Sequence, residues 1–316
     1  MKTATVFCTV LVFLLSSVTS PLAAEKQKVS FYNGPPQGGW RPIAVAIQQV
    51  IQKAIPNLEV NIEPGGGAAN VIAVDSKPGV FAMVTSTSTY DGFLGRPPFK
   101  KKMENLREIA ILFTQPAHMI TFADVPIKTV ESLKGKRISV TPRGYASETV
   151  NQMILKAHGL DYKDVQAQFL GEIDSIDSMR DGHLDAFLIM TSVPYPLFLE
   201  LASARKVSLL SLSPGKIREL SRENKGLRPY TIKAGSYPQI NSDVTTFESS
   251  VHVAANKEMP DALAEQITKA LVEALPDLQK NFAFMKGLSP NDMGGDLGIP
   301  FHPGAARFYQ SRGLMK

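Results

Sequence analysis

Two spacings of hydrophobic residues alternate along this chain and predict strands and helices in turn. Val29 and Phe31 alternate with polar residues, as in a half-buried strand, whereas the apolar residues of 43–54 recur at helical spacing. The same order returns with a strand over 58–62 and continues through most of the sequence. Strands and helices that alternate in this way predict parallel α/β sheets.

The stretch Glu63–Asn70 joins one such strand to the following helix and contains Gly65, Gly66 and Gly67. Glycines allow a backbone to approach a ligand closely. The free N–H groups of a helix start lie at the positive end of the helix dipole and favour a carboxylate or a phosphate. A plain tight turn is the alternative for a lone run of glycines. Because the layout recurs elsewhere in the chain, we interpret the stretch as part of an anion pocket.

Further loops follow predicted strands in the same way, at 33–40, 141–147 and 191–196. Ligands of parallel α/β sheets bind at the carboxyl ends of strands, where the helices start. We therefore expect these loops to face each other across a cleft between two lobes, the favoured place for a small-molecule site. A run of serines and threonines at 85–89 follows another strand and supplies hydroxyl donors, although simple capping of a helix would explain it equally well.

The predicted ligand site draws on all of these loops. Its residues are Gly39, Trp40, Arg41, Gly67, Ala68, Ala69, Asn70, Thr85, Ser86, Thr87, Arg143, Gly144, Tyr145, Ala146, Ser147, Thr191, Ser192, Pro194 and Tyr195. Arg41 or Arg143 would form a two-pronged contact with a carboxylate, or would be a surface arginine. Trp40, Tyr145 and Tyr195 would line or cover the pocket, with core packing as the alternative.

The length of 316 residues is enough for two lobes. We predict a signal peptide over 1–24, the first part of lobe 1 over 25–116, lobe 2 over 117–211, and the second part of lobe 1 with C-terminal helices over 212–316. The signal has Lys2, a short apolar run and small residues before Glu25. Since the only cysteine, Cys8, lies within it, the mature chain would have no disulfides. We expect an exported, periplasmic protein and a monomer.

The net charge of +5 falls to +4 when Lys2 is removed with the signal, and it is spread along the chain. The densest basic run, 100–102, is followed by Glu104 and reads as a solvated surface. Basic residues interleaved with aromatic ones, which would indicate a nucleic-acid partner, are not found. A modest positive charge suits a small organic anion or an amino-acid-like ligand.

The sequence shows no catalytic set and no metal or cofactor motif. Its five histidines are isolated, and the nucleophile elbow and the phosphate-binding Walker loop are missing. The run Ser213–Lys216 matches S-x-x-K without the companion motifs, which indicates chance. We therefore expect no enzyme. A periplasmic hydrolase or transferase is the alternative, and it would need a histidine close to Ser147 or Ser192.

From about Val29 to Gly313 the chain resembles the TAXI family, the solute receptors of TRAP transporters. The most specific pieces are Ile299-Pro300-Phe301-His302-Pro303-Gly304-Ala305-Ala306-Arg307-Phe308-Tyr309 and Gly65-Gly66-Gly67-Ala68-Ala69-Asn70, supported by 133–140 and 181–187. The resemblance implies a two-lobed α/β clamshell of the periplasmic-binding-protein type, type II-like, that closes on a small carboxylate and delivers it to a TRAP permease.

Three of the loops depart from the usual TAXI residues. They read 36–42 Pro-Gln-Gly-Gly-Trp-Arg-Pro, 144–147 Gly-Tyr-Ala-Ser and 191–194 Thr-Ser-Val-Pro. The position of the pocket is therefore expected to be inherited, while its ligand is not transferred. A receptor of an ATP-driven or tripartite tricarboxylate system, or an exported ligand sensor, is the alternative function.

Overall fold

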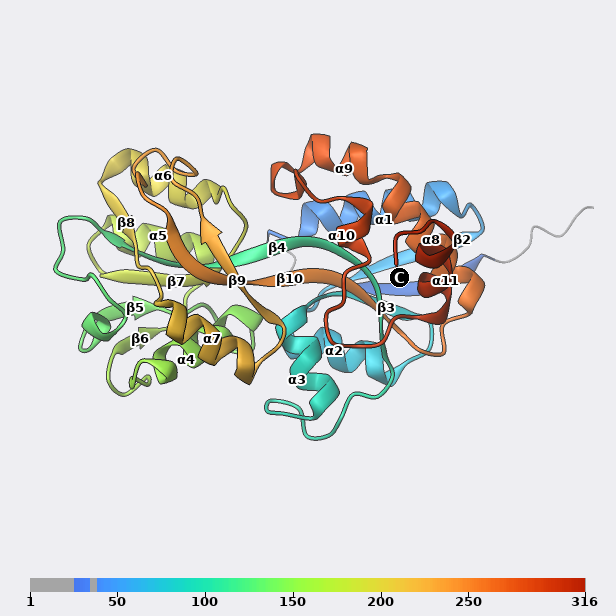
Figure 1. Cartoon of the computed structure of the whole chain (residues 1–316), viewed down its shortest axis with the longest axis horizontal. Helices are drawn as coiled ribbons and strands as arrows, with labels where there is room; N and C mark the ends of the chain where they lie inside the picture. The colour runs from blue at the N-terminus through green and yellow to red at the C-terminus, as the bar shows by residue number, and fades with distance from the viewer. Residues whose placement is uncertain (1–25, 35–38, 316) are drawn as a thin grey trace, which may run out of the picture.

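The computed structural model describes residues 26–34 and 39–315. The predicted signal peptide, 1–24, lies outside the described residues. Two α/β lobes lie next to each other along the long axis of the molecule, joined by two long strands (Figure 1). The predicted two-lobed α/β architecture is confirmed. Within the described part of the chain, no helix combines the length and the apolar character that a bilayer crossing needs.

The first lobe has a central sheet with the strand order β2-β1-β3-β10-β4. Its strands are β1 (Gln27–Tyr32), β2 (Leu58–Glu63), β3 (Val80–Thr85), β10 (Val244–Asn256) and β4 (Leu106–Phe122). The strands β1, β2 and β3 are parallel to one another, and β10 is antiparallel to both of its neighbours, β3 and β4. Helices cover both faces, α1 (Arg41–Ala54) and α8 (Asp261–Glu273) on one and α2 (Gly67–Ser76) and α3 (Ser86–Leu94) on the other.

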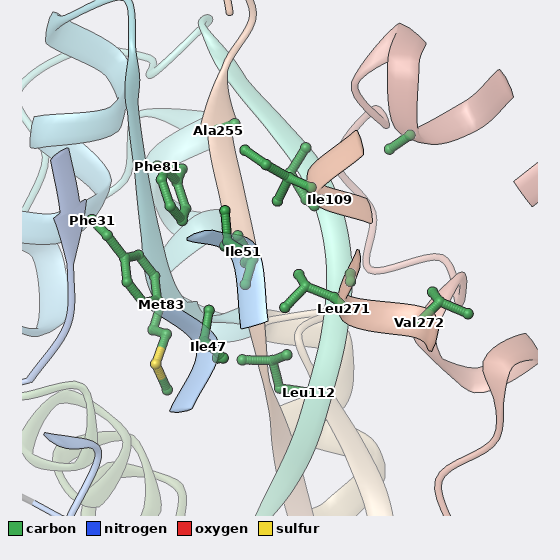
Figure 2. Packing of buried hydrophobic residues seen from close by; sticks show 14 of the residues in the cluster. Phe31, Ile47, Ile51, Phe81, Met83, Ile109, Leu112, Ala255, Leu271 and Val272 are labelled. Carbon is green, nitrogen blue, oxygen red and sulfur yellow. The ribbon is translucent and has the colours of Figure 1, made fainter. Parts of the chain in front are cut away.

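The core of this lobe follows the predicted periodicity. In α1, Ile43, Ile47 and Ile51 repeat at four-residue spacing and are fully buried on the sheet. Phe31 of β1 stacks on Phe81 of β3 with ring centroids 4.6 Å apart (Figure 2). Each such side chain contributes about 1.5–3 kcal/mol by leaving water. The loops at the strand ends are thereby held on a rigid base.

The second lobe repeats this plan with the strand order β6-β5-β7-β4-β8. Its own strands are β5 (Arg137–Ser139), preceded by the short helix η1 (Glu131–Leu133), β6 (Gln166–Gln168), β7 (Ala186–Met190) and β8 (Val207–Leu209). The helices α4 (Ala146–Ala157) and α7 (Pro214–Glu223) pack on one face, and α5 (Glu172–Arg180) and α6 (Pro196–Ala204) on the other. In both lobes, helices therefore start at the carboxyl ends of the strands.

The C-terminal segment packs back onto the first lobe. It contains α9 (Leu275–Asn281), the short helix η2 (Ala283–Met285), α10 (Pro290–Met293) and α11 (Pro303–Ser311). The buried Tyr309 donates its hydroxyl to the carbonyls of Ile109, at 3.1 Å, and Met293, at 3.2 Å. A side chain on Gly304 would lie 2.1 Å from the Asp261 carbonyl oxygen of α8. The conspicuous motif 299–309 therefore serves the packing of α11.

The apolar runs 108–113 and 119–122 predict two separate strands from the sequence alone, whereas the structure has the single strand β4 over both. Its first part pairs with β10 and its last part with β7 and β8, so it belongs to both sheets. The sequence suggests a break because Gln115 interrupts the apolar run, yet this residue lies in the cleft between the lobes. The strand β10 likewise joins two predicted strands into one.

The second lobe extends further along the chain than its predicted end at residue 211. Ile217 and Leu220 of α7 lie in the same apolar cluster as Ile154 of α4, and Tyr237 packs against Phe198 of α6. The strand β9 (Leu227–Ile232), which the sequence did not predict, pairs with the first half of β10. The chain therefore returns to the first lobe along β10, because residues 212–243 have their apolar partners in the second lobe.

Candidate functional site

A cavity of about 690 Å³, open to solvent, lies between the lobes at the carboxyl ends of the parallel strands. Both lobes and both long strands contribute to its walls. The described lining residues are Gly34, Gly39, Trp40, Gly66, Gly67, Thr85, Thr87, Gln115, Tyr145, Ala146, Ser147, Val150, Glu172, Met190 and Ser249. A concave, largely apolar site with a few polar groups is typical of small-molecule binding.

Two helix starts face the cavity from opposite lobes without a side-chain cap from the described residues. They are the start of α2 at Gly67 and the start of α4 at Ala146. The first amide groups of a helix have no acceptor within the helix and carry its positive partial charge. Two such starts on one cavity form a binding site for an anionic group.

The two lobes touch at these helix starts. Gly67 has φ +49°, and a Cβ added to it would lie 2.2 Å from the carbonyl oxygen of Gly144 and 3.4 Å from the backbone nitrogen of Ala146. The missing side chain at Gly67 therefore allows the backbones of the two lobes to meet. This contact closes one side of the cavity.

Asn70 ties two loops of the first lobe to strand β3 and does not line the cavity. Its Nδ2 donates to the carbonyls of Asn33 and Met83, both at 2.8 Å, and its Oδ1 accepts from the amide of Gly66 at 2.7 Å. The side chain is fully buried, so these bonds occupy it completely. The predicted ligand contact of Asn70 is thus replaced by the positioning of the loops that form the pocket.

Hydroxyl groups from two distant segments meet at the start of α3. Thr85 Oγ1 caps the amide of Ser88 and lies 3.0 Å from Thr87 Oγ1. Ser249 of β10 lies 3.3 Å from the same Thr87 hydroxyl and 3.0 Å from the hydroxyl of Ser86. Thr85, Thr87 and Ser249 line the cavity, whereas Ser86 is buried behind them and donates to the Gly226 carbonyl. They present a hydrogen-bonding wall of neutral groups.

Glu172, at the start of α5, is the acidic side chain of the lining. Its Oε2 accepts the Tyr195 hydroxyl at 2.8 Å. Burial raises the pKa of the Glu172 carboxyl, and the hydrogen bond from Tyr195 opposes that rise. A carboxylate that is partly withdrawn from water needs a donor or a cation to balance it.

A buried chain of hydrogen bonds holds Tyr195 in place. Its amide donates to the Tyr237 hydroxyl at 3.0 Å, which lies 2.7 Å from His118 Nε2. His118 Nδ1 lies 3.0 Å from the Pro116 carbonyl oxygen in β4. Burial lowers the pKa of His118 to about 4, so this imidazole is neutral near pH 7. Neutral His118 therefore donates from Nδ1 to Pro116 and accepts from Tyr237 at Nε2.

The structure brings eight of the predicted site residues into the lining and places the others around it. Those in the lining are Gly39, Trp40, Gly67, Thr85, Thr87, Tyr145, Ala146 and Ser147. Those outside it, besides Asn70 and Ser86, are Arg41, Ala68, Ala69, Arg143, Gly144, Thr191, Ser192, Pro194 and Tyr195. Arg143 is exposed, and its guanidinium lies 3.9 Å from the ring centre of Phe169. The expected arginine contact is therefore replaced there by stacking on an aromatic ring.

Three lining residues with polar side chains, Glu172, Gln115 and Ser249, are not among the predicted site residues. The apolar positions of 165–170 predict a strand, and Glu172 lies two residues after it, so it stands at a strand-to-helix junction like the predicted loops. That junction has one glycine and no hydroxyl run, which is why it was passed over. Gln115 and Ser249 lie within long strands, and no local pattern separates their cavity-facing positions from others.

The described residues contain no group of three or more potential ligands that could hold a metal ion. The Ser147 hydroxyl accepts from the amide of Met190 at 3.2 Å, and no histidine belongs to the described lining. The histidine that a hydrolase was expected to place beside Ser147 is thus not found among the described lining residues.

Comparison with known proteins gives one family and a set of related folds. The chain matches the NMT1-like family over residues 32–313. A protein of Escherichia coli (strain K12), whose name provisionally assigns it the binding of aliphatic sulfonates, is 27% identical over 238 residues, which are 72% of this chain and 68% of that protein.

Among solved structures, MatC from Rhodopseudomonas palustris with bound malate has a TM-score of 0.57 at 12% identity, covering 91% of this chain and 98% of that one. The periplasmic binding protein BugD has a TM-score of 0.54 at 14% identity, covering 92% and 99%. The fold is thus the type II periplasmic-binding-protein fold, as expected.

Proposed function

The chain belongs to the NMT1-like family and is a solute-binding protein of transport, and we propose that it captures a small carboxylate or sulfonate between its lobes. The observation that carries this proposal is the pair of uncapped helix starts, α2 and α4, that face one cavity from opposite lobes. The family is one of solute-binding proteins and not of enzymes. With the lobes in contact at Gly67 and Gly144, the amides of both starts would hold one anionic group between them.

The relatives support this choice of solute. The Escherichia coli relative is assigned to aliphatic sulfonates by its name, and MatC was solved with malate. A sulfonate and a carboxylate both carry several oxygen acceptors on one charged group, and such a group suits donation from backbone amides and hydroxyls. We propose a periplasmic location, in keeping with the periplasmic BugD.

A thermal-shift screen of organic sulfonates and carboxylates tests the proposal. A ligand that binds only the folded state at a hundred times its Kd stabilises it by about 2.7 kcal/mol. The variant Ala146→Phe, which fills the cavity at the start of α4, should lose the shift. Thr149→Phe, on the same helix outside the lining, is the matched control and should keep it. If no compound of either class raises the melting temperature, and native mass spectrometry finds no bound organic anion, the proposed capture is refuted.

The partner is proposed to be an ATP-driven or a tripartite tricarboxylate transporter, the alternatives that the sequence leaves open, because the relatives support these better than a TRAP permease. A TRAP permease is the second candidate, and the resemblance of the 299–309 motif to the TAXI family favours it. Copurification with the membrane proteins encoded beside the gene distinguishes them. An ATPase subunit in the complex supports the ATP-driven system and excludes the TRAP permease.

A further inference from the structure

The charge of the cavity lining is unusual for a site that receives an anion. Among the described lining residues there is no lysine, arginine or histidine, and Glu172 is the one carboxylate. The charged side chains of the lining therefore sum to a negative charge, and the anionic group of a solute is met only by amides and hydroxyls.

A chain of hydrogen bonds fixes the position of Glu172. Tyr195, which is 4% exposed, donates its hydroxyl to Oε2, and Tyr237 and His118 hold the backbone of Tyr195 from behind. No partner for Oε1 is recorded among the residues that the structure describes. A supported carboxylate with one oxygen uncommitted is suited to accept a hydrogen bond from a ligand.

A simple alkyl anion would leave this carboxylate unbalanced. Closing the lobes removes water from Glu172 and brings a second negative charge into the same cavity, and both effects oppose binding. A protonated amine on the ligand reverses both, because it donates to Glu172 and cancels its charge. The apolar side chains of Trp40, Val150 and Met190 would contact the carbon skeleton between the two charged groups.

We propose that Glu172 accepts the protonated amine of the solute, and that the solute is a zwitterion with one amine and one carboxylate or sulfonate. This inference rests on the proposed function, in which the helix starts hold the anionic group. It adds that compounds with two negative charges and no amine, such as malate, are rejected. Glu172 is thereby the residue that determines specificity, and Tyr195 positions it.

Isothermal titration calorimetry with matched compounds tests the assignment. The probes are 3-aminopropanesulfonate against propanesulfonate, β-alanine against propionate, and malate. For wild-type protein we expect the amine-bearing member of at least one pair to bind about tenfold or more tightly than its partner, as for a charge-assisted hydrogen bond. Glu172→Gln should abolish that difference. Tyr195→Phe should reduce it while leaving the weak binding of the amine-free partner in place.

Asp174→Asn is the matched control. Asp174 is an exposed acid on the same helix, two residues beyond Glu172 and outside the lining, so its loss should leave the preference unchanged. Equal binding of the amine-bearing and amine-free members, or tight binding of malate, overturns this proposal and leaves the proposed anion capture intact. A bound compound found by native mass spectrometry that lacks a basic nitrogen also overturns it. If no probe binds and no bound solute is found, the proposed function fails as well.

Discussion

Replacing Gly67 with alanine places a methyl group at the contact between the two lobes. The added Cβ would lie 2.2 Å from the Gly144 carbonyl oxygen, whereas ordinary contacts of this kind begin at about 3.4 Å. The lobes must therefore separate by about 1 Å at this point, and the backbone amides of α2 and α4 move apart with them. The change acts on the closed state, because the contact exists only when the lobes meet.

The expected cost has two parts. A left-handed conformation, φ +49°, costs an alanine about 1–2 kcal/mol relative to glycine, and this part lowers the free energy of unfolding in open and closed states alike. Steric overpacking costs about 1–3 kcal/mol and opposes closure alone. If closure accompanies binding, a coupling of this size weakens the affinity for the solute by roughly 5- to 150-fold.

Calorimetry with a solute identified by thermal shift gives the affinity. Closure is measured by pulsed electron paramagnetic resonance between spin labels at Ile72→Cys in α2 and Lys156→Cys in α4, both exposed, in a Cys8→Ser background. Addition of solute should shorten the label distance in the parent protein and should do so less, or only at higher concentration, with Gly67→Ala.

Gly182→Ala is the control for the backbone effect. Gly182 also has a positive φ, +76°, but a Cβ there meets nothing within 4 Å. It should lower the melting temperature much as Gly67→Ala does, with affinity and label distance unchanged. An affinity within about threefold of the parent for Gly67→Ala, with a normal change in label distance, would refute the argument that the lobes close onto this glycine.

Three other substitutions test neighbouring parts of the argument. Asn70→Ala removes the side-chain partner of three backbone groups, two of them in buried hydrogen bonds, and should destabilise the fold by about 3 kcal/mol in chemical unfolding, whereas Ala at the exposed Asn61 should cost under about 0.5 kcal/mol. Arg143→Ala should change the affinity less than about threefold, because the guanidinium stacks on Phe169; a tenfold loss would place it in the site. Glu108→Gln should stabilise the protein, and the gain should grow as pH rises, because burial and the nearby Asp296 raise the pKa of the Glu108 carboxyl in the folded state. The wild type therefore loses stability between the unfolded pKa of about 4.5 and the higher folded pKa. The loss is about 1.4 kcal/mol for each unit by which the two pKa values differ. Melting temperatures at pH 4 and 8 measure this, and a gain that does not grow with pH contradicts it.

The succession of strands and helices could be predicted from the sequence because burial imposes its period on each element. The α1 face of Ile43, Ile47 and Ile51 is an example. The prediction failed where a residue served the cavity instead of the core. Gln115 is polar within β4 because it faces the cleft, and the strand appeared to end there. The extent of the second lobe depends on which distant apolar residues meet, as Tyr237 and Phe198 do, and local patterns contain no such information.

The site was predicted as far as backbone chemistry determines it. Glycine and hydroxyl residues at strand ends identified the starts of α2, α3 and α4, because those positions need a small or capping residue. Side-chain direction could be predicted only in part: Trp40 and Tyr145 line the cavity as expected, whereas other side chains do not. Asn70 and Arg143 have the chemistry of ligand contacts, yet the backbone of the first lobe and an aromatic ring occupy them. Ser249 reaches Ser86 across 163 positions, a distance that only the completed sheet spans.

The sharing of β4 between both sheets has a consequence for how the protein assembles. Since β4 and β10 complete the first sheet and β4 is also an inner strand of the second, neither half has a finished scaffold by itself. A fragment that ends after β3 lacks both long strands, and β10 is synthesised late. We therefore expect that folding during synthesis becomes cooperative only after the chain has emerged beyond residue 256. The complete molecule should show one melting transition, with no independently stable half.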